Sequence, residues 1–286
     1  DVTLQIRRGE IFGLVGESGC GKSTLGKLLL NLETSDSGEV LYHGKNITRY
    51  SFSQMRKIRK ELQMVFQNNS DSFNPYYTVR QIIMEPLKNY NRGNTKKNDQ
   101  LVEEMIQQVG LDTSYLNRYG NELSGGQRQR VGIARALILT PEFVVCDEAV
   151  SALDVSIQAQ VLNLLQQLQK DFNLTYLFIS HDLSVVEMIS DRIGVMYLGT
   201  IVETAPKKEL YANPRHPYTR ALLSAVPIPD PEVKKERITL KGDLPSPSNP
   251  PSGCLFHTRC PHCTEKCKTQ VPTPVEIAPG HVVKCH

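Results

Sequence analysis

The sequence contains no long hydrophobic run and almost no excess of one charge. Its longest apolar runs, such as Ile11–Val15 and Phe143–Cys146, have the length of a β-strand, whereas a helix that crosses a bilayer needs about 20 apolar residues. Lys and Arg number 33 against 30 Asp and Glu, which leaves a net charge of +3. We therefore expect no membrane-spanning segment, no signal peptide and no polycationic surface for nucleic acid.

The chain has the size and composition of a folded α/β protein. Its 286 residues leave room for one large domain with an appendage or for two domains, and 40% of them are apolar, which excludes a disordered chain. From Thr3 to about Ala225, apolar runs alternate with helical patterns, which predicts a parallel sheet wound with helices. We expect strands at Thr3–Arg7, Ile11–Val15, Glu39–Tyr42, Leu62–Phe66, Phe143–Asp147, Thr175–Ser180, Arg192–Tyr197 and Thr200–Thr204. We expect helices at Lys22–Leu32, Val79–Tyr90, Asp99–Val109, Gly125–Leu139, Ser156–Phe172 and Asp182–Ile189, and an exposed loop at Asn91–Asn98.

The character of the chain changes after Val226. Most of the 17 prolines follow this residue, and regular helices cannot run through such a stretch. Because this part has few core-forming residues, it needs a cross-link or a metal to hold a shape, or else it is a linker. We predict one domain over residues 1–225 and a small irregular extension over 226–286.

A phosphate-binding loop follows the apolar run Ile11–Val15. The segment matches the pattern GxxxxGK[ST] at every fixed position. Its glycines allow backbone N–H groups to turn toward phosphates, and the helix predicted from Lys22 adds the positive end of its dipole. Lys22 is predicted to contact the β- and γ-phosphates and the Ser23 hydroxyl to ligate Mg²⁺. The predicted nucleotide-binding residues are Gly16, Glu17, Ser18, Gly19, Cys20, Gly21, Lys22, Ser23 and Thr24.

Two further motifs fit beside this loop. The apolar run Phe143–Cys146 ends in Asp147 and Glu148; Asp147 can hold Mg²⁺, and Glu148 is placed to take a proton from an attacking water. Leu123–Gln127, with the sequence LSGGQ, precedes a predicted helix. Ser124 would be the N-cap of that helix, and the glycines after it would leave N–H groups free for a second anion.

These motifs resemble, in order and spacing, those of the ATPase subunits of ATP-binding cassette (ABC) transporters. The resemblance covers the whole chain, and it implies a P-loop NTPase fold with a RecA-like α/β core, an antiparallel β subdomain and a helical subdomain at about residues 78–140. In this family the helical insertion docks the membrane partner. The motifs that agree are the phosphate loop Gly16–Thr24, Gln67, the signature Leu123–Gln127, Asp147-Glu148 and His181.

The resemblance implies a role for each residue. Gln67 would sense Mg²⁺ and the attacking water, His181 would contact the γ-phosphate, and Asp154 would lie in a loop that meets a second subunit. Two ATPases are expected to close head to tail, so that the signature of one touches the γ-phosphate held by the other. The expected catalytic residues are Glu148, His181 and Gln67, the expected Mg²⁺ site is Ser23, Gln67 and Asp147, and the expected signature residues are Ser124, Gly125, Gly126 and Gln127.

One feature departs from the family pattern. The aromatic residue that stacks on adenine in this family lies in a strand upstream of the phosphate loop. Here the only aromatic residue before Gly16 is Phe12, inside an expected core strand, and the chain begins at Asp1 rather than at Met. We therefore expect the native N-terminus to be missing, and we assign no adenine-stacking residue.

The C-terminal part resembles the extension of the oligopeptide and dipeptide importer branch, which also includes nickel and metal-chelate importers. The segment from His216 to Leu223, which we expect to begin a short helix, and the segment from Leu244 to Cys260 carry this resemblance. The phrase DEAVSALD at Asp147–Asp154 is most similar to the F-type subunit, which pairs with a related D-type ATPase.

Five of the seven cysteines lie in this extension, and three interpretations remain open. A cytoplasmic ATPase works in a reducing compartment, where clustered thiols more often hold metal than form disulfides. The resemblance implies a [4Fe–4S] cluster on Cys254, Cys260, Cys267 and Cys285. A Zn²⁺ site using the CxxC spacing of Cys260 and Cys263, with His257 or His262, is the second interpretation, and free thiols without metal are the third. Under either metal interpretation we expect a structural role.

We therefore predict an ATP-hydrolysing subunit that powers peptide import across the cell membrane. Its expected partners are a paralogous ATPase, two integral membrane permease subunits and, through the complex, an extracytoplasmic solute-binding protein, with no nucleic acid. It would lie at the cytoplasmic face of the membrane, with ATP and Mg²⁺ as cofactors. Nickel or a metal chelate is the alternative cargo. An ABC ATPase that works away from membranes, in DNA repair, translation or iron–sulfur assembly, is the alternative of a different class.

Overall fold

The computed structural model describes residues 2–67, 73–90, 95–226 and 237–286. The chain divides into two compact units. The first, here called the terminal unit, comprises Asp1–Ile6, Glu10–Lys22 and Ser180–His286. The second, the central unit, comprises Arg7–Gly9 and Ser23–Ile179. Each unit is described by itself.

The central unit is built on the parallel strands β4 (Leu62–Val65), β5 (Phe143–Asp147) and β6 (Thr175–Ser180), with β5 in the middle. Every residue of β6 is buried, as expected for a parallel sheet covered on both faces. Helix α1 (Lys22–Leu29) packs closely on β5 and β6, since a Cβ on Gly26 would lie 2.9 Å from Val145 and 3.1 Å from Ile179. The carboxyl ends of the parallel strands thus meet at one edge of this sheet.

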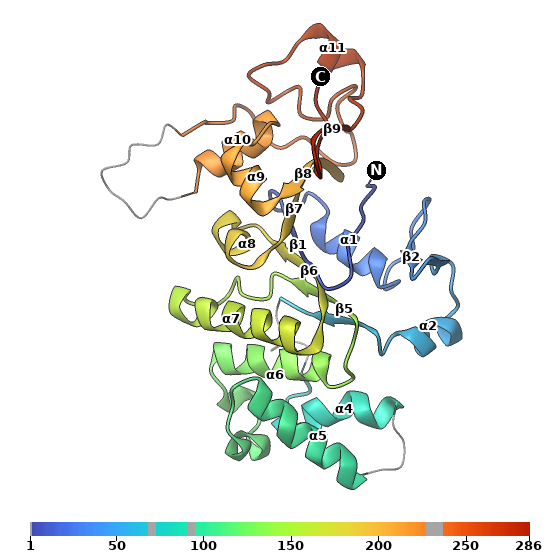
Figure 1. Cartoon of the computed structure of the whole chain (residues 1–286), viewed down its shortest axis with the longest axis vertical. Coiled ribbons are helices and arrows are strands. Elements are labelled where there is room, and N and C mark those ends of the chain that lie inside the picture. The colour runs from blue at the N-terminus through green and yellow to red at the C-terminus, as the bar shows by residue number, and fades with distance from the viewer. Residues whose placement is uncertain (1, 68–72, 91–94, 227–236) are drawn as a thin grey trace. The chain divides into compact units, whose positions relative to one another are not determined.

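Helices make up most of the rest of the central unit. Helices α4 (Val79–Tyr90) and α5 (Thr95–Gln108) pack on each other and on α6 (Gly125–Leu137), which also contacts α7 (Val155–Phe172), as Figure 1 shows in green. The 3-10 helices η1 (Thr113–Asn117) and η2 (Gly120–Glu122) connect α5 to α6. The hairpin of β2 (Leu41–Tyr42) and β3 (Lys45–Asn46) and helix α2 (Phe52–Ile58) lie between α1 and β4. Helix α7 is the crossover between the parallel strands β5 and β6.

The terminal unit has a mixed sheet in the order β1 (Ile11–Val15), β7 (Arg192–Tyr197), β8 (Thr200–Pro206), β10 (His281–Val283) and β9 (Val275–Ala278). Strands β1 and β7 are parallel, and the other neighbours are antiparallel. Helix α8 (Leu183–Ile189) packs on β1. Helices α9 (Lys207–Ala212), α10 (Pro217–Ser224) and α11 (Glu265–Thr269) complete the unit.

The extension is more regular than its composition predicts. Its hairpin β9–β10 adds to the edge of the sheet, with Val282 opposite Thr204 and Val283 opposite Glu203. A buried pair also ties this hairpin to the sheet, because His281 Nε2 lies 2.7 Å from Glu203 Oε1 and both side chains are fully buried. The sequence signal for this hairpin is the Pro-Gly turn between two β-branched runs.

The expected helices and strands are largely confirmed, with three exceptions. The strand expected at Thr3–Arg7 is wrong: no strand is assigned there, and the carbonyl of Gln5 accepts from the Arg192 side chain, at 3.3 Å, instead of pairing in a ladder. The strand expected at Glu39–Tyr42 is only β2. The loop expected at Asn91–Asn98 is wrong for residues 95–98, which belong to α5, and its first part lies outside the described residues.

Candidate functional site

The phosphate loop leaves β1 in a conformation that only glycine suits. Gly16 has φ +157°, and a Cβ there would lie 2.2 Å from the Met196 carbonyl oxygen, so a side chain would displace β7 or the loop. Lys22, 5% exposed, donates to the carbonyl oxygens of Gly16 (2.9 Å) and Glu17 (3.0 Å). The loop therefore curls around the ammonium group that is predicted to reach the phosphates.

Glu17 of this loop is held by two residues late in the chain, Arg259 and Tyr218. Arg259 donates to both carboxylate oxygens, from Nη1 to Oε2 at 2.7 Å and from Nη2 to Oε1 at 3.1 Å. The backbone N–H of Glu17 donates to the Tyr218 hydroxyl oxygen at 2.9 Å. Neither Arg259 nor Tyr218 was singled out from the sequence, since no local pattern pairs residues more than 200 positions apart.

In the central unit, two polar pairs lie at the carboxyl end of β5. The Ser23 hydroxyl donates to Asp147 Oδ1 at 2.8 Å, and Gln67 Nε2 donates to Glu148 Oε2 at 2.8 Å. Glu148 has a left-handed backbone, φ +46°, and its N–H donates to the Ile179 carbonyl at 3.0 Å. Such a backbone is uncommon outside glycine and is often found at functional sites.

These central-unit contacts bring together every residue that the sequence assigned to Mg²⁺ and to the proton acceptor. Hydroxyl, carboxylate and amide oxygens are the donors that Mg²⁺ prefers, so the residues present fit that ion. The covalent chain passes from Lys22 in the terminal unit to Ser23 in the central unit. His181 lies in the terminal unit, exposed, directly before Asp182, whose side chain caps α8 by accepting from Ser184 N–H.

The signature segment begins α6. Ser124 is the N-cap and accepts from Gln127 N–H, while the Gln127 side chain accepts from Ser124 N–H at 2.9 Å and donates to the Tyr115 hydroxyl at 3.1 Å. Gly126 faces α7 so closely that a Cβ would lie 2.4 Å from Ile157 Cγ2. Asp154 caps α7 by accepting from Ile157 N–H at 3.0 Å. The two helix starts that the resemblance assigns to a subunit contact are therefore capped and packed against each other.

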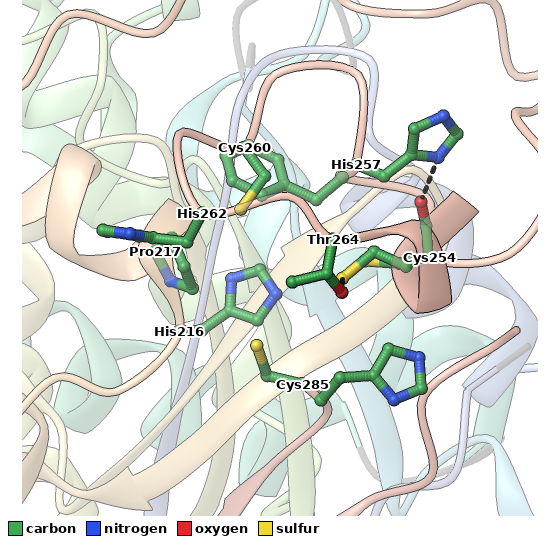
Figure 2. A pocket seen from close by; sticks show the side chains of 11 residues that line it. His216, Pro217, Cys254, His257, Cys260, His262, Thr264 and Cys285 are labelled. Carbon is green, nitrogen blue, oxygen red and sulfur yellow. Dashed lines mark hydrogen bonds between the residues drawn. The ribbon is translucent and has the colours of Figure 1, made fainter. Parts of the chain in front are cut away.

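The cysteines of the extension divide into two groups. Cys254, Cys260, Cys267 and Cys285 all line one pocket of about 80 Å³, together with His216 and Thr264. Figure 2 shows Cys260 and Cys285 approaching this pocket from opposite sides. Cys263 is absent from the described lining of the pocket; its Sγ lies 3.5 Å from the Thr264 carbonyl. All seven cysteines, each within the described residues, are free thiols.

Burial and hydrogen bonds set the protonation of the pocket thiols. Burial raises the pKa of Cys254, Cys260 and Cys285. In contrast, the hydrogen bond between Thr264 Oγ1 and Cys267 Sγ, at 3.3 Å, lowers the pKa of Cys267. Gly253 has φ +65°, and a Cβ there would lie 2.5 Å from the Cys267 carbonyl. This close approach aligns Cys254 with Cys267, whose carbonyl accepts from Cys254 N–H at 2.8 Å.

The pocket thiols are not arranged as ligands of a single metal ion. Over the part of the chain that the structure describes, no group of three or more His, Cys, Asp or Glu side chains is set to hold a metal ion. A mononuclear Zn²⁺ site needs its ligands within about 2.0–2.3 Å of one point, and the pocket thiols do not converge in that way. The four thiols that the resemblance assigns to one cluster do line the same pocket, and all four offer sulfur as the ligand atom.

Comparison with known proteins identifies the family of this chain. Residues 1–151 match the family model described as "ABC transporter". The loop, the acidic strand end and this match define an ABC-type ATPase, and the chain belongs to the ABC transporter ATP-binding family. Residues 202–267 match a second family model, "Oligopeptide/dipeptide transporter, C-terminal region".

Individual relatives and solved structures resemble the whole chain or its greater part. The oligopeptide transport ATP-binding protein AppF of Bacillus subtilis is 56% identical, over 100% of this chain and 88% of its own length. A dimeric ATP-binding cassette, MJ0796, bound to ADP and phosphate, is 28% identical with a TM-score of 0.66, over 72% of this chain and 89% of its own. The protein cbiO1 of Clostridium perfringens, part of the ABC transporter complex cbiONQ, is 27% identical with a TM-score of 0.68, over 73% of this chain and 82% of its own.

Proposed function

We propose that this chain hydrolyses ATP to drive the import of peptides through separate membrane subunits. The observation that supports the hydrolytic part is the pair of contacts at the end of β5, from Ser23 to Asp147 and from Gln67 to Glu148. The peptide cargo is supported by the match of residues 202–267 and by the name of the AppF relative. Among the described residues, no helix is long and apolar enough to cross a membrane.

The proposed chemistry is the transfer of a phosphoryl group to water. Backbone N–H groups of the loop Gly16–Thr24 and the ammonium of Lys22 bind the phosphates. Ser23, Asp147 and Gln67 would hold Mg²⁺, which neutralises charge on the β- and γ-phosphates. Glu148 takes a proton from a water molecule while the oxygen of that water attacks the γ-phosphorus. The bond from the γ-phosphorus to the β-phosphate oxygen then breaks, and ADP and phosphate leave. His181 contacts the γ-phosphate.

The proposed assembly is a head-to-tail pair with a paralogous ATPase of the D type, this chain being the F type. Ser124, Gly125, Gly126 and Gln127 would contact the ATP bound by the other subunit, and Asp154 would lie in the contact. The dimeric form of the MJ0796 cassette supports such a pair. The pair would bind two membrane permease subunits at the cytoplasmic face and, through them, act with a solute-binding protein.

We further propose that Cys254, Cys260, Cys267 and Cys285 hold a [4Fe–4S] cluster with a structural role. Four thiols on one pocket, with Cys263 outside its described lining, support this set over the Zn²⁺ alternative, which needs Cys263. Thiolates are the usual ligands of such clusters. The cluster would lend shape to the proline-rich extension, proposed as residues 226–286, beside an ATPase domain of residues 1–225.

The function is tested on the assembled complex. Affinity purification of the full chain from solubilised membranes should recover integral membrane subunits and a related ATPase, and vesicles containing that complex should accumulate labelled peptide and not ⁶³Ni²⁺. Recovery of nucleic acid or ribosomes instead would contradict the transport function.

The role of Glu148 is tested by substitution in the same complex. Glu148→Gln should lower ATP turnover by at least about a hundredfold, the usual contribution of a general base, and leave ATP binding intact. The matched control is Glu142→Gln, because Glu142 precedes β5 and pairs with His43 at 2.9 Å, away from the Gln67 contact. Substantial turnover by Glu148→Gln would remove Glu148 as the base.

The metal is tested on anaerobically purified chain. Iron with labile sulfide and a brown colour supports the cluster, whereas zinc alone, or no metal, contradicts it.

A further inference from the structure

Every polar group of Glu17 has a partner in the terminal unit. Its N–H donates to the Tyr218 hydroxyl at 2.9 Å, and its carbonyl accepts from Lys22 Nζ at 3.0 Å. Its carboxylate accepts two hydrogen bonds from Arg259, at 2.7 and 3.1 Å. Glu17 is thus the residue through which the phosphate loop is held by chain segments far away in the sequence.

Arg259 is a largely buried partner for this carboxylate. Its side chain is 9% exposed and that of Glu17 is 30% exposed. The guanidinium also lies 6.0 Å from the centre of the Tyr197 ring, and hydrogen bonding to Glu17 raises the pKa of Arg259 further above its ordinary value. A planar, bidentate pair of this kind fixes orientation as well as charge.

The position of Arg259 ties the pair to the core of the extension. Its N–H donates to the Phe256 carbonyl at 3.0 Å. The Phe256 ring, 1% exposed, packs edge-on against Tyr197, with centroids 5.2 Å apart, and lies 5.5 Å from Tyr218. Cys260, which lines the cysteine pocket, is the next residue in the chain. One packed turn therefore carries a pocket thiol, the anchoring ring and the partner of Glu17.

The charge of Glu17 gives the pair a consequence for binding. A carboxylate inside a loop that holds a polyphosphate repels that ligand unless a cation neutralises it. The cation here does not come from the ATPase core but from the extension. The same contact orients Glu17, whose carbonyl in turn holds the ammonium of Lys22.

We propose that Arg259 is a positioning residue of the ATP site, which acts through Glu17 and makes nucleotide affinity depend on the folded extension. The proposal rests on the ATP binding proposed above for Gly16–Thr24. It assigns to the extension a part in the nucleotide chemistry, beyond the shape that the cysteine pocket gives to it.

The test measures Mg²⁺-ATP affinity of the purified full chain by isothermal titration calorimetry. Arg259→Ala should weaken the affinity for Mg²⁺-ATP about tenfold. This loss lies between the small effect of breaking an exposed ion pair and the large effect of breaking a buried one. Glu17→Gln should bind within about threefold of wild type or more tightly, because it removes the repelling charge. The double variant should recover to within about threefold of wild type, since the carboxylate that Arg259 neutralised is gone.

Salt and two control variants complete the design. High KCl should reduce the loss in Arg259→Ala, because it screens the repulsion between Glu17 and the phosphates. Arg259→Lys should lie between wild type and Arg259→Ala, since it keeps the charge but loses the bidentate geometry. Lys268→Ala removes a cation from the same extension, where it pairs with Glu265 at 2.6 Å, and should bind as wild type.

Two results would overturn the proposal. One is wild-type affinity in Arg259→Ala. The other is a loss that Glu17→Gln does not repair and salt does not reduce, which would mean that Arg259 only supports the fold of the extension. Failure of the proposed function gives a different result, namely that the wild-type chain does not bind ATP or that Lys22→Ala binds it equally well.

Discussion

Phe256 offers the sharpest test of how the extension is anchored. Its ring is 1% exposed and contacts Tyr197, Tyr218 and His216, with ring centroids 5.2, 5.5 and 5.5 Å away. Replacing such a phenylalanine by alanine costs about 3–5 kcal/mol of unfolding free energy, through lost burial and the cavity that remains. The edge-on contact with Tyr197, at an interplanar angle of 87°, is part of this total.

Phe256→Ala is therefore expected to destabilise the terminal unit by about 3–5 kcal/mol. The chain has no tryptophan and 11 tyrosines, so near-ultraviolet circular dichroism of tyrosine during urea unfolding reports on the packing around Tyr197 and Tyr218. The melting temperature should fall by roughly 2 °C for each kcal/mol in a chain of this length. In the metal-free chain, reaction of Cys254 and Cys267 with a thiol reagent should also become faster, since each is 9% exposed in the intact structure.

Phe52→Ala is the matched control. Phe52 is 68% exposed, and its only described ring contact is with Arg59, whose guanidinium carbon lies 5.4 Å from the ring centre. Its removal should cost less than about 1 kcal/mol. Equal stability losses in the two variants, or an unchanged rate of thiol reaction in Phe256→Ala, would refute the view that this ring anchors the extension.

Three further substitutions test the signature, the cysteine pocket and a buried histidine. Gly126→Ala should lower ATP turnover of the assembled complex at least about tenfold, because its Cβ would meet Ile157 Cγ2 at 2.4 Å and displace α6. Adding Ile157→Ala should recover part of the lost turnover, and equal turnover in the single and the double variant would contradict the steric cause. Gly253→Ala should lower the iron content per chain, since its Cβ would lie 2.5 Å from the Cys267 carbonyl. Undiminished iron content, measured by elemental analysis, would separate the metal from this pocket. Burial lowers the pKa of His216 to about 4, so its contribution to stability is present above pH 6.5 and is lost as the pH falls from 6.5 through 4, by up to about 3 kcal/mol. His216→Asn keeps an acceptor for Tyr218 N–H and should flatten the dependence of the urea midpoint on pH in this range; an unchanged slope would assign the effect to other groups.

The motifs with strict local spacing could be interpreted from the sequence. The strands Ile11–Val15, Phe143–Asp147 and Thr175–Ser180 are confirmed with the expected bounds. Each is a short apolar run between polar or glycine-rich segments, which is a pattern that burial in a parallel sheet requires along the chain itself. The loop, the acidic strand end and the signature are equally local, because each depends on a few neighbouring residues at a strand end or a helix start.

The extension shows where such patterns stop being informative. The prolines indicated an irregular tail that needs a cross-link or a metal to hold a shape, or else is a linker. Instead, β9 and β10 form a hairpin on β8, and Phe256 packs in a small aromatic cluster. These features depend on partners elsewhere in the chain: His281 on Glu203, and Phe256 on Tyr197 and Tyr218. A single sequence lists the residues but does not indicate which distant residues contact each other in the folded chain.

The sequence by itself determined the chemistry of this protein. A lysine and a serine at the start of a helix, carboxylates at the end of a strand and a second glycine-rich helix start define an ATP-hydrolysing site, because each motif works through the backbone of adjacent residues. Only the tertiary structure decided how Glu17 is neutralised and which thiols share a pocket. Arg259 and Glu17 are 242 positions apart, and contacts over that separation arise from the folding of the sheet rather than from any local pattern.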